Sequence, residues 1–325
     1  MINNKVHMLG TVIDQTNFSF PGQQAVYQGK VRDVYDLGDS LLLVATDRYS
    51  AFDRNLALIP EKGALLTAIS SWWFDQTKHI VPNHVISTPD PNVVWGKKYK
   101  VVPIEMVVRG YITGVTNTSL WHTYSEGQRD FGNFTLPDGL KKNDALPQPV
   151  LTPTTKFEKH DRNLTPEQAV KEGLVDSDVW KQMQDIALML FSFGQKIAAE
   201  KGLVLVDTKY EFGLDEQNNL VLIDEIHTPD SSRYWLKDHY QANLDRGEEP
   251  ENYDKEFLRL WFKSRFDPYK DSTAPTPDET TLIELKRRYR NVYERLTGAA
   301  YQPATGNDLL LRIEKNVMKA IKSRG

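Results

Sequence analysis

Apolar and polar residues alternate along residues 26–37, which is the period of a β-strand with one buried face. Gly38 and Asp39 then predict a tight turn, and the apolar run at residues 41–46 predicts the partner strand. The polar face of the first strand carries the side chains of Gln28, Lys30, Arg32 and Asp36. We therefore expect an N-terminal antiparallel sheet.

Helical spacing of apolar residues is found at residues 64–79 and again at 178–201, where Gly202 is expected to end the helix. Thr165, Pro166 and Glu167 predict another helix start, because they supply a cap, a proline at the first position and an acidic first turn. Roughly the last ninety residues also favour helices, interrupted by prolines.

The middle of the chain mixes strands with a long irregular stretch. Residues 99–108 favour a strand, but Pro103 predicts that it is an edge strand or a crossover, and we expect a lobe boundary there. Residues 131–163 contain many prolines and glycines without periodicity, which is typical of a long functional or disordered loop. Residues 203–226 predict a strong β-hairpin.

Composition narrows the class of protein. The chain has 325 residues with 40% hydrophobic and 26% charged residues, which is a globular composition large enough for two or three lobes. A net charge of -4 argues against nucleic-acid binding as the main activity. The absence of cysteine excludes disulfides, thiolate nucleophiles and zinc–thiolate sites. Without a signal-like N-terminus or a long apolar run, we expect a cytoplasmic protein that has no contact with membranes.

The common nucleotide-binding motifs are missing. Gly22 and Gly29-Lys30 are separated by six residues where a P-loop needs four, and Val31 stands where Ser or Thr is required. The sequence also has no dinucleotide fingerprint, no Gly-x-Ser-x-Gly elbow and no His-Glu-x-x-His. Any nucleotide site must therefore be built in another way.

The hairpin at residues 203–226 carries the most informative charges. Asp207, Lys209 and Glu211 fall on one face of its first strand. If Glu211 lies opposite Asp224, the connecting loop has four residues, 216–219, and a divalent cation would relieve the repulsion between the two carboxylates. Carboxylates together with phosphates suit Mg²⁺, and a lysine on the same face can hold the same phosphates.

The alternative for this hairpin is a half-exposed ribbon with alternating charges. Two features favour a Mg–nucleotide site instead. The charged face begins directly after the apolar run 203–206, so it is expected near a buried region. A polar loop at residues 228–233 follows at once and ends in Arg233, a residue type suited to bidentate binding of phosphate or carboxylate.

Other polar segments allow both a functional and a structural interpretation. Lys30 and Arg32 could bind an anion or form an exposed basic strand face, and residues 46–53 could line a site or only stabilise a turn. Arg109 follows an apolar strand with glycines nearby, where a ligand could approach the backbone, although a lone arginine is often structural. Lys156 lies in the long loop and could be a mobile surface residue.

Taken in order, five segments resemble the phosphoribosylaminoimidazole-succinocarboxamide synthase (SAICAR synthetase) family. The resemblance covers most of the chain up to residue 240, and its last two segments are the most specific. The segments are GKVRDVYDLGDSLLLVATDRYSAFD (residues 29–53), PIEMVVRGYITG (103–114), LTPTTKFEKHD (151–161), LVDTKYEFG (205–213) and LIDEIHTPDSSRYW (222–235).

The resemblance implies an α+β fold related to ATP-grasp enzymes and protein kinases. It has an N-terminal antiparallel β lobe, a larger α/β lobe and C-terminal helices, which we place at residues 1–105, 106–240 and 241–325. It also implies ATP, bound between the first two lobes, and Mg²⁺. The implied reaction joins the amine of L-aspartate to the carboxylate of carboxyaminoimidazole ribotide, giving SAICAR, ADP and phosphate through an acyl phosphate.

The family's functional residues can be carried over to matching positions of this chain. Glu211 and Asp224 are implied to bind Mg²⁺, and with Lys209 they form the implied catalytic group. The implied nucleotide-binding residues are Lys30, Arg32, Lys156 and Lys209, with Glu105 and Val107 in the hinge that faces adenine. The implied substrate-binding residues are Arg109, Arg233 and Ser119 for the ribotide phosphate, and Asp47, Arg48, Ser50 and Asp230 for the imidazole and aspartate pocket.

One departure from the family pattern concerns the ribotide phosphate. Family members commonly read Gly-Ser after the Arg109 segment, whereas here Gly114 is followed by Val115. An insertion of four residues, 115–118, displaces the expected continuation, so Ser119 becomes the candidate. The other possibility is that backbone amides together with Thr116 or Thr118 hold the phosphate.

Two other functions have to be weighed. A small-molecule kinase or another ATP-dependent carboxylate–amine ligase would share Lys209, Glu211 and Asp224, but a kinase would need no aspartate pocket. Residues 281–325 hold ten Lys or Arg and four Asp or Glu and could bind nucleic acid, although an amphipathic surface helix explains them more simply. We expect only small-molecule substrates as partners, and the sequence leaves monomer and homodimer open.

Overall fold

The computed structural model describes residues 11–116, 119–158, 162–304 and 308–324. The chain divides into two compact units. Unit 1 consists of Met1–Trp72, His84–Lys98 and Lys255–Gly325, and unit 2 consists of Trp73–Asn83 and Tyr99–Asp254. The three-part division expected from the sequence stays a prediction.

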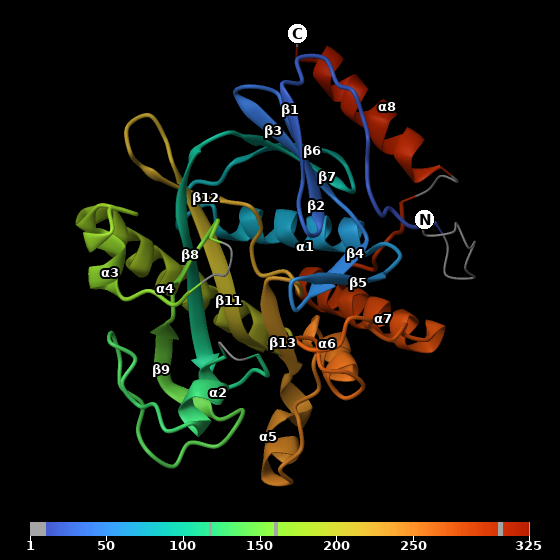
Figure 1. The fold of residues 1–325 in the computed structure, drawn as a ribbon. Coiled ribbons are helices and arrows are strands. Elements are labelled where there is room, and N and C mark those ends of the chain that lie inside the picture. The colour runs from blue at the N-terminus through green and yellow to red at the C-terminus, as the bar shows by residue number, and fades with distance from the viewer. Residues whose placement is uncertain (1–10, 117–118, 159–161, 305–307, 325) are drawn as a thin grey trace. The chain divides into compact units, whose positions relative to one another are not determined.

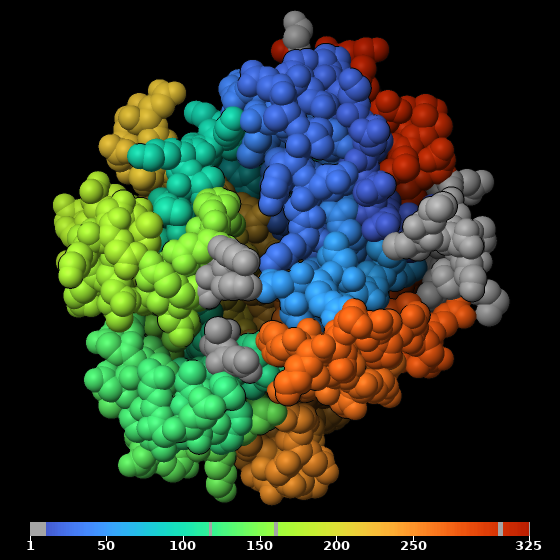
Figure 2. Space-filling view, viewed as in Figure 1, coloured from blue at the N-terminus to red at the C-terminus, as the bar shows by residue number. Residues whose placement is uncertain are grey.

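Unit 1 is built on a five-stranded antiparallel sheet in the order β1-β2-β3-β7-β6 (Figure 1). The blue N-terminal strands of this unit lie at the surface in the space-filling view (Figure 2), and all four residues of β1 are exposed. The strands are β1 (Ala25–Gln28), β2 (Arg32–Asp36), β3 (Ser40–Ala45), β6 (Val85–Asp90) and β7 (Val93–Lys97).

The single strand predicted over residues 26–37 is wrong, because the chain reverses within it. β1 and β2 form a hairpin in which the Gly29 N–H donates to the Arg32 carbonyl at 2.7 Å. The predicted turn at Gly38 is confirmed, since Gly38 has a φ of +97° and β3 pairs with β2. Alternation continues through a tight hairpin turn without a break, so the pattern alone could not locate this turn.

Two apolar cores complete unit 1. Helix α8 (Leu309–Lys322) buries Ile313 and Val317 against Tyr35, Val93 and Trp95 of the sheet. The hairpin of β4 (Arg48–Ala51) and β5 (Arg54–Leu58) packs with α6 (Glu256–Lys263), α7 (Glu279–Thr297) and the first turns of α1 (Lys62–Thr77). The expected helix at residues 64–79 and the expected C-terminal helices are thus confirmed, and unit 1 takes in both ends of the chain.

Unit 2 contains an antiparallel sheet whose strands differ in length, with the long strand β11 at its centre. β11 pairs with β8 on one side and with β12 and β13 on the other, while β8 also pairs with β9 and β10. The strands are β8 (Lys100–Tyr111), β9 (Ala145–Leu151), β10 (Thr154–Thr155), β11 (Leu203–Leu214), β12 (Leu220–Ile223) and β13 (Ser232–Leu236).

The prediction that Pro103 marks an edge strand is wrong, whereas the alternative of a crossover stays a prediction. β8 is paired on both sides, and Pro103 lies where its pairing with β11 shifts between Glu211 and Gly213. A β-bulge tolerates a residue without an N–H. The Pro103 carbonyl still accepts from the Lys156 N–H at 3.0 Å, so this residue also holds the start of the following loop.

The helices of unit 2 follow the sequence signals closely. α3 (Pro166–Lys171) begins with a capping box between Thr165 and Gln168, and α4 (Ser177–Glu200) ends before Gly202, which has a φ of +71°. α4 packs against β8 and β11 (Figure 1). The remaining helices are α2 (Leu120–Ser125) and α5 (Lys237–Asp245). The α+β class with antiparallel sheets and C-terminal helices is confirmed.

Within the described ranges, no helix combines the length and the apolar character that crossing a membrane requires.

Candidate active site

Four charged side chains meet on one face of the unit 2 sheet, and we call them the mixed-charge cluster: Glu105, Lys156, Lys209 and Glu211. The Lys209 Nζ lies 2.8 Å from Glu105 Oε1 and 2.8 Å from Glu211 Oε1. The Lys156 Nζ donates to the other oxygen of Glu211. Strand pairing explains the meeting, because Glu105 of β8 lies opposite Glu211 of β11. Both carboxylate oxygens of Glu211 are therefore bound by ammonium groups.

The cluster keeps its members charged in spite of burial. Burial alone would raise the pKa of Glu211, but Lys209 and Lys156 outweigh it and hold that pKa well below the ordinary 4.5. Burial alone would lower the pKa of Lys209, but the charges of Glu211, Glu105 and Asp224 raise it well above 10.5. Asp224 thus acts on the same ammonium group as the two glutamates.

The predicted opposition of Glu211 and Asp224 is wrong by one residue. Glu211 lies opposite Ile223, and the loop comprises the five residues 215–219. The Asp215 side chain accepts from the Gln217 and Asn219 N–H groups at 2.9 and 2.8 Å, which favours the longer loop. Asp224 follows the last residue of β12 with a φ of +69°, so it leaves the ladder.

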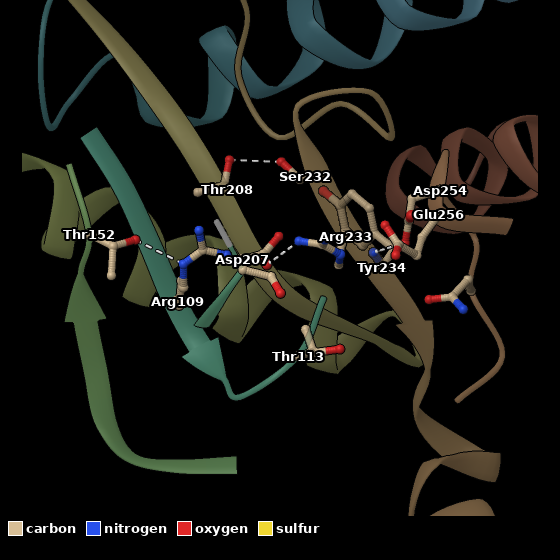
Figure 3. A network of polar contacts seen from close by, with 12 residues as sticks. Arg109, Thr113, Thr152, Asp207, Thr208, Ser232, Arg233, Tyr234, Asp254 and Glu256 are labelled. Carbon is tan, nitrogen blue, oxygen red and sulfur yellow. Dashed lines mark hydrogen bonds and ion pairs between the residues drawn. The ribbon is translucent and has the colours of Figure 1, made fainter. Parts of the chain in front are cut away.

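Two arginines, Arg109 and Arg233, share Asp207 nearer the start of β11, and we call these two arginines the arginine pair. Figure 3 shows Asp207 between the two guanidinium groups. Arg233 Nη1 lies 2.6 Å and Arg109 Nη1 lies 3.5 Å from Asp207 Oδ2. Arg109 Nε also donates to Thr152 Oγ1 at 2.8 Å (Figure 3). Strand register again brings these side chains together, because Asp207 of β11 lies opposite both arginines.

The arginine pair carries an excess of positive charge in a largely buried place. The two arginine side chains are 13% and 14% exposed and the carboxylate is 6% exposed. Burial lowers the pKa of Arg109, Asp207 opposes this shift and the charge of Arg233 adds to it. An arginine stays protonated in proteins, so two positive charges face one negative charge. Such a site favours a further anion.

Ser119 lies beside the arginine pair. A Cβ placed on Gly114 would be 2.5 Å from the Ser119 Cβ and 3.5 Å from Arg233 Nη2. Gly114 has a φ of +108°, which favours glycine. Ser119 is the N-cap of α2, and its N–H donates to the Thr116 carbonyl at 2.9 Å. Part of the insertion, residues 117–118 with Thr118, lies outside the described residues.

Asp230 lies in a tight loop that joins β12 to β13. The Thr228 Oγ1 donates to Glu225 Oε2 at 2.7 Å and accepts from the Asp230 and Ser231 N–H groups at 3.3 and 3.2 Å. Asp230 is buried. The loop is therefore stiffened by its own side chains, and the Asp230 position is fixed relative to the start of β13.

The predicted nucleotide residues of unit 1 lie around the β1–β2 turn. Lys30 is 64% exposed and its ammonium pairs with the exposed Asp53. Arg32 begins β2 and is half-buried. In unit 2, Val107 of the predicted hinge lies opposite Lys209, and its carbonyl accepts from the Thr152 N–H at 2.9 Å. That these residues bind nucleotide stays a prediction.

The predicted substrate residues of unit 1 make internal contacts. Asp47 is buried, its pKa is raised to about 6 by burial, and it accepts from the Ile13 and Gly63 N–H groups at 2.8 and 3.0 Å. Arg48 donates to the carbonyls of Gly29 and Lys30 at 3.0 and 3.1 Å, so it holds the β1–β2 turn.

Ser50 is half-buried in β4, where it pairs with Asn55 of β5. A substrate role for Asp47, Arg48 and Ser50 stays a prediction.

Sequence reasoning missed Asp207 and Thr152 as parts of the site. Asp207 shares a face with Lys209 and Glu211 in the sequence pattern, but nothing along the chain reveals which arginines pair with it. Thr152 contacts Arg109 only because β9 pairs with β8. Both contacts depend on strand register, which a single sequence does not specify.

Comparison with known proteins identifies the family. A family model described as SAICAR synthetase matches residues 25–276. Phosphoribosylaminoimidazole-succinocarboxamide synthase of Legionella pneumophila (strain Paris) is 54% identical over 289 residues, which are 88% of this chain and 93% of that protein.

Two solved structures are similar as well. The SAICAR synthase from Saccharomyces cerevisiae complexed with SAICAR is 34% identical, with a TM-score of 0.75 over 89% of this chain and 99% of that one. A SAICAR synthetase (Type-2) in complex with ADP is 25% identical, with a TM-score of 0.66 over 86% of this chain and 100% of that one. The chain therefore belongs to the SAICAR synthetase family and is an ATP-dependent ligase of purine biosynthesis.

Proposed function

We propose that the mixed-charge cluster binds the Mg–nucleotide and that the arginine pair binds the phosphate of the ribotide. The observation that carries this proposal is the spacing of Asp207, Lys209 and Glu211 on β11. Alternate residues of one strand point to one face at intervals of about 7 Å, so the two charge environments are neighbours on a rigid element. One end is suited to a metal with phosphates, and the other end is suited to an anion.

The residues present fit Mg²⁺. Glu211 is a buried carboxylate that stays ionised, and Asp224 acts electrostatically on the same lysine. Mg²⁺ in nucleotide sites takes hard oxygen ligands from one or two carboxylates and from phosphates. We propose Glu211 and Asp224 as these ligands, and the ion supplies charge neutralisation on the phosphates when it is bound. Among the described residues, no three His, Cys, Asp or Glu side chains are grouped as a metal site.

Lysines supply the remaining positive charge. Lys209 is held between two carboxylates and stays protonated, so it can act as a fixed point charge on a phosphate oxygen. Lys156 is bound to Glu211 and can move its ammonium to a phosphate when the carboxylate takes a metal. Lys30 belongs to unit 1, where its exposed pair with Asp53 contributes little to stability, so an anion can replace Asp53 there at small cost.

The arginine pair and Ser119 are suited to the ribotide phosphate. Guanidinium groups bind phosphate in a bidentate manner, and burial strengthens this binding because water competes less. Ser119 can add a hydroxyl donor, since Gly114 brings its backbone close to both Ser119 and Arg233. We place the imidazole and the incoming aspartate near Asp230, which the loop before β13 fixes in position.

This arrangement supports an acyl-phosphate mechanism. A carboxylate oxygen of the ribotide attacks the γ-phosphorus of ATP, the bond to the bridging oxygen breaks and ADP leaves. The aspartate amine then attacks the carbonyl carbon, the C–O bond to phosphate breaks, and the amine nitrogen loses a proton. Phosphoryl transfer of this kind needs positioning and charge neutralisation more than covalent help from the protein.

A coupled ADP-release assay tests the proposal. ATP, Mg²⁺, the carboxylated ribotide and L-aspartate are supplied together, and each is then omitted in turn. ADP release that needs all four, with SAICAR as the product, supports the proposed roles. ADP release that persists without aspartate, with a stable phosphorylated product, would indicate a kinase-like activity instead. The cytoplasmic location expected from the sequence stays a prediction.

A further inference from the structure

A buried histidine lies on the core side of the unit 2 sheet, behind the mixed-charge cluster. His227 has no exposed surface and lies in the segment that joins Asp224 to Arg233. Both Asp224 and His227 have positive φ values, +69° and +49°. Non-glycine residues in this region of backbone conformation are strained and persist only when their surroundings hold them. The contacts of His227 therefore contribute to holding this segment in its conformation.

His227 is fixed from several directions. Its Nε2 lies 2.5 Å from the Tyr210 hydroxyl, and its carbonyl accepts from the Tyr234 hydroxyl at 2.7 Å. The Trp73 ring meets the imidazole edge-on, with the ring centres 4.6 Å apart. A Cβ on Gly194 of α4 would lie 2.4 Å from the His227 Cε1, so the ring occupies space that only a glycine leaves.

The protonation states define the direction of the central hydrogen bond. A phenol is protonated at neutral pH, so the Tyr210 hydroxyl carries a hydrogen that it can donate. Burial lowers the pKa of His227 to about 3, so the imidazole is neutral. In the described part of the chain the Tyr210 hydroxyl has no acceptor other than His227 Nε2. With Tyr210 as the donor, Nε2 accepts and the imidazole proton lies on Nδ1, the ring nitrogen that has no hydrogen-bond partner among the described residues.

Tyr210 connects this bond to the site. It stands between Lys209 and Glu211 on β11, and its side chain points to the opposite face of the strand. A bond from Tyr210 to His227 thus ties the segment after β12 to the same residues that carry the mixed-charge cluster. A second tie, between Thr208 Oγ1 and Ser232 Oγ at 2.7 Å, joins β11 to β13 (Figure 3).

We infer that His227 is a positioning residue of the reaction: through Tyr210 it fixes Asp224 on one side, and Asp230 and Arg233 on the other, relative to Glu211. The inference rests on the proposed function, because it concerns the placement of the proposed metal and ribotide ligands. Displacement of such groups by about 1 Å can reduce turnover by as much as 100-fold, so a hydrogen bond in the core can control chemistry on the opposite face.

Tyr210→Phe is the most direct test, since it removes one hydroxyl and keeps the ring. We expect a folded protein whose KM for Mg–ATP and KM for the ribotide both rise, with kcat/KM lowered roughly 10- to 100-fold. His227→Leu should behave alike, and the double variant should be no worse than either single variant. His227→Gln keeps an acceptor near the Nε2 position and should restore most of the activity.

Tyr35→Phe is the matched control. Tyr35 is equally buried in the unit 1 sheet, and its hydroxyl lies 2.8 Å from Thr16 Oγ1 and accepts from the Phe18 N–H at 3.0 Å. Its loss should lower Tm without changing either KM. A Tyr210→Phe protein that loses thermal stability in the same way, but keeps wild-type kcat and KM values, would overturn the inference.

A spectroscopic readout separates this inference from the proposed function. ¹⁵N chemical shifts of His227 in the folded protein should show a protonated Nδ1 and an unprotonated Nε2 that do not change between pH 8 and pH 5. A proton on Nε2, or titration within this range, would refute the hydrogen bond whatever the enzyme does. Loss of aspartate-dependent activity in the wild-type assay would refute the proposed function and leave these shifts unchanged.

Discussion

The mixed-charge cluster and the arginine pair lie on one face of the same strand and differ in their balance of charge. In the cluster, Lys156 and Lys209 are matched by Glu105 and Glu211, and Asp224 adds a further negative charge. In the arginine pair, two guanidinium groups share one carboxylate. The first group is therefore the one that we propose for a cation together with phosphates, and the second is the one that we propose for an anion alone.

The difference indicates how one strand can present two charge environments to two different groups of the substrates. Asp207, Lys209 and Glu211 are separated by one residue each, so the proposed anion site and the proposed metal–phosphate site are neighbours along β11. Because the neighbours come from β8, β13 and the loops at their ends, each group can be altered without touching the other. The comparison can therefore be tested by substitutions confined to one group.

Glu211→Gln should have the largest effect. The change keeps the shape of the side chain but leaves Lys156 and Lys209 without the negative charge between them. We expect kcat to fall at least about 100-fold, as when a main charge-stabilising group is removed. The coupled ADP-release assay measures this fall. Glu248→Gln, which alters an exposed pair with Arg246, is the control and should keep a normal kcat. A near-normal kcat in Glu211→Gln would contradict the proposed role of Glu211 as a metal ligand.

Arg233→Met should change substrate affinity more than turnover. It removes one charge of the arginine pair, and truncating a buried charged partner typically costs about 2–5 kcal/mol, which is a rise of about 30-fold or more in KM for the ribotide. KM for Mg–ATP should stay nearly constant. Arg246→Met, at an exposed position, is the control. An equal rise in both KM values would show that the two groups do not act separately.

Gly114→Ala should have a smaller effect that reports on Ser119. The φ of +108° costs any added side chain about 1–3 kcal/mol, and the new Cβ would press on Ser119 and move it away from Arg233. Gly127→Ala is a close control, since Gly127 has a φ of +102° and nothing within 4 Å. Both variants should lose stability, but only Gly114→Ala should raise KM for the ribotide. If the two kinetic profiles coincide, Ser119 has no part in binding.

The pH dependence of stability should show the smallest effect. Lys209 and Lys156 hold the pKa of Glu211 below the ordinary 4.5, so ionised Glu211 stabilises the folded state above about pH 4.5, and this contribution is lost as the pH falls. The difference in Tm between the wild type and Glu211→Gln should therefore be largest near neutral pH and should shrink toward pH 3. A difference that is constant with pH would mean that Glu211 is not ionised in the cluster.

Much of this architecture could be predicted from the sequence because local signals agree with the fold. The helix beginning after Thr165 has its cap, proline and acidic first turn in adjacent positions, and the alternation on β11 places three charged residues on one face. The partners of these charges could not be predicted. Whether Glu211 lies opposite Ile223 or Asp224 depends on how Asp215 closes a loop, which is a matter of one residue.

Strands that contain proline could not be predicted correctly from the sequence either. Residues 145–151 were expected to belong to a long loop, yet they form β9 with Pro147 and Pro149 inside it. β9 pairs only with β8 in the described sheet, so an edge without partners can accept residues that lack an N–H. Pro103 shows the opposite case, because it lies at a bulge within a strand that is paired on both sides, where an edge strand is the usual expectation. Proline alone therefore does not distinguish these environments.

The β1–β2 turn offers a clean attachment point for a probe. Arg48 holds this turn through the backbone carbonyls of Gly29 and Lys30, so the path of the chain does not depend on which side chain stands at position 30. The chain contains no cysteine, and a cysteine introduced at that exposed position would be the only thiol in the molecule. A fluorophore or spin label attached there would report the motion of this turn alone, on an otherwise unaltered backbone.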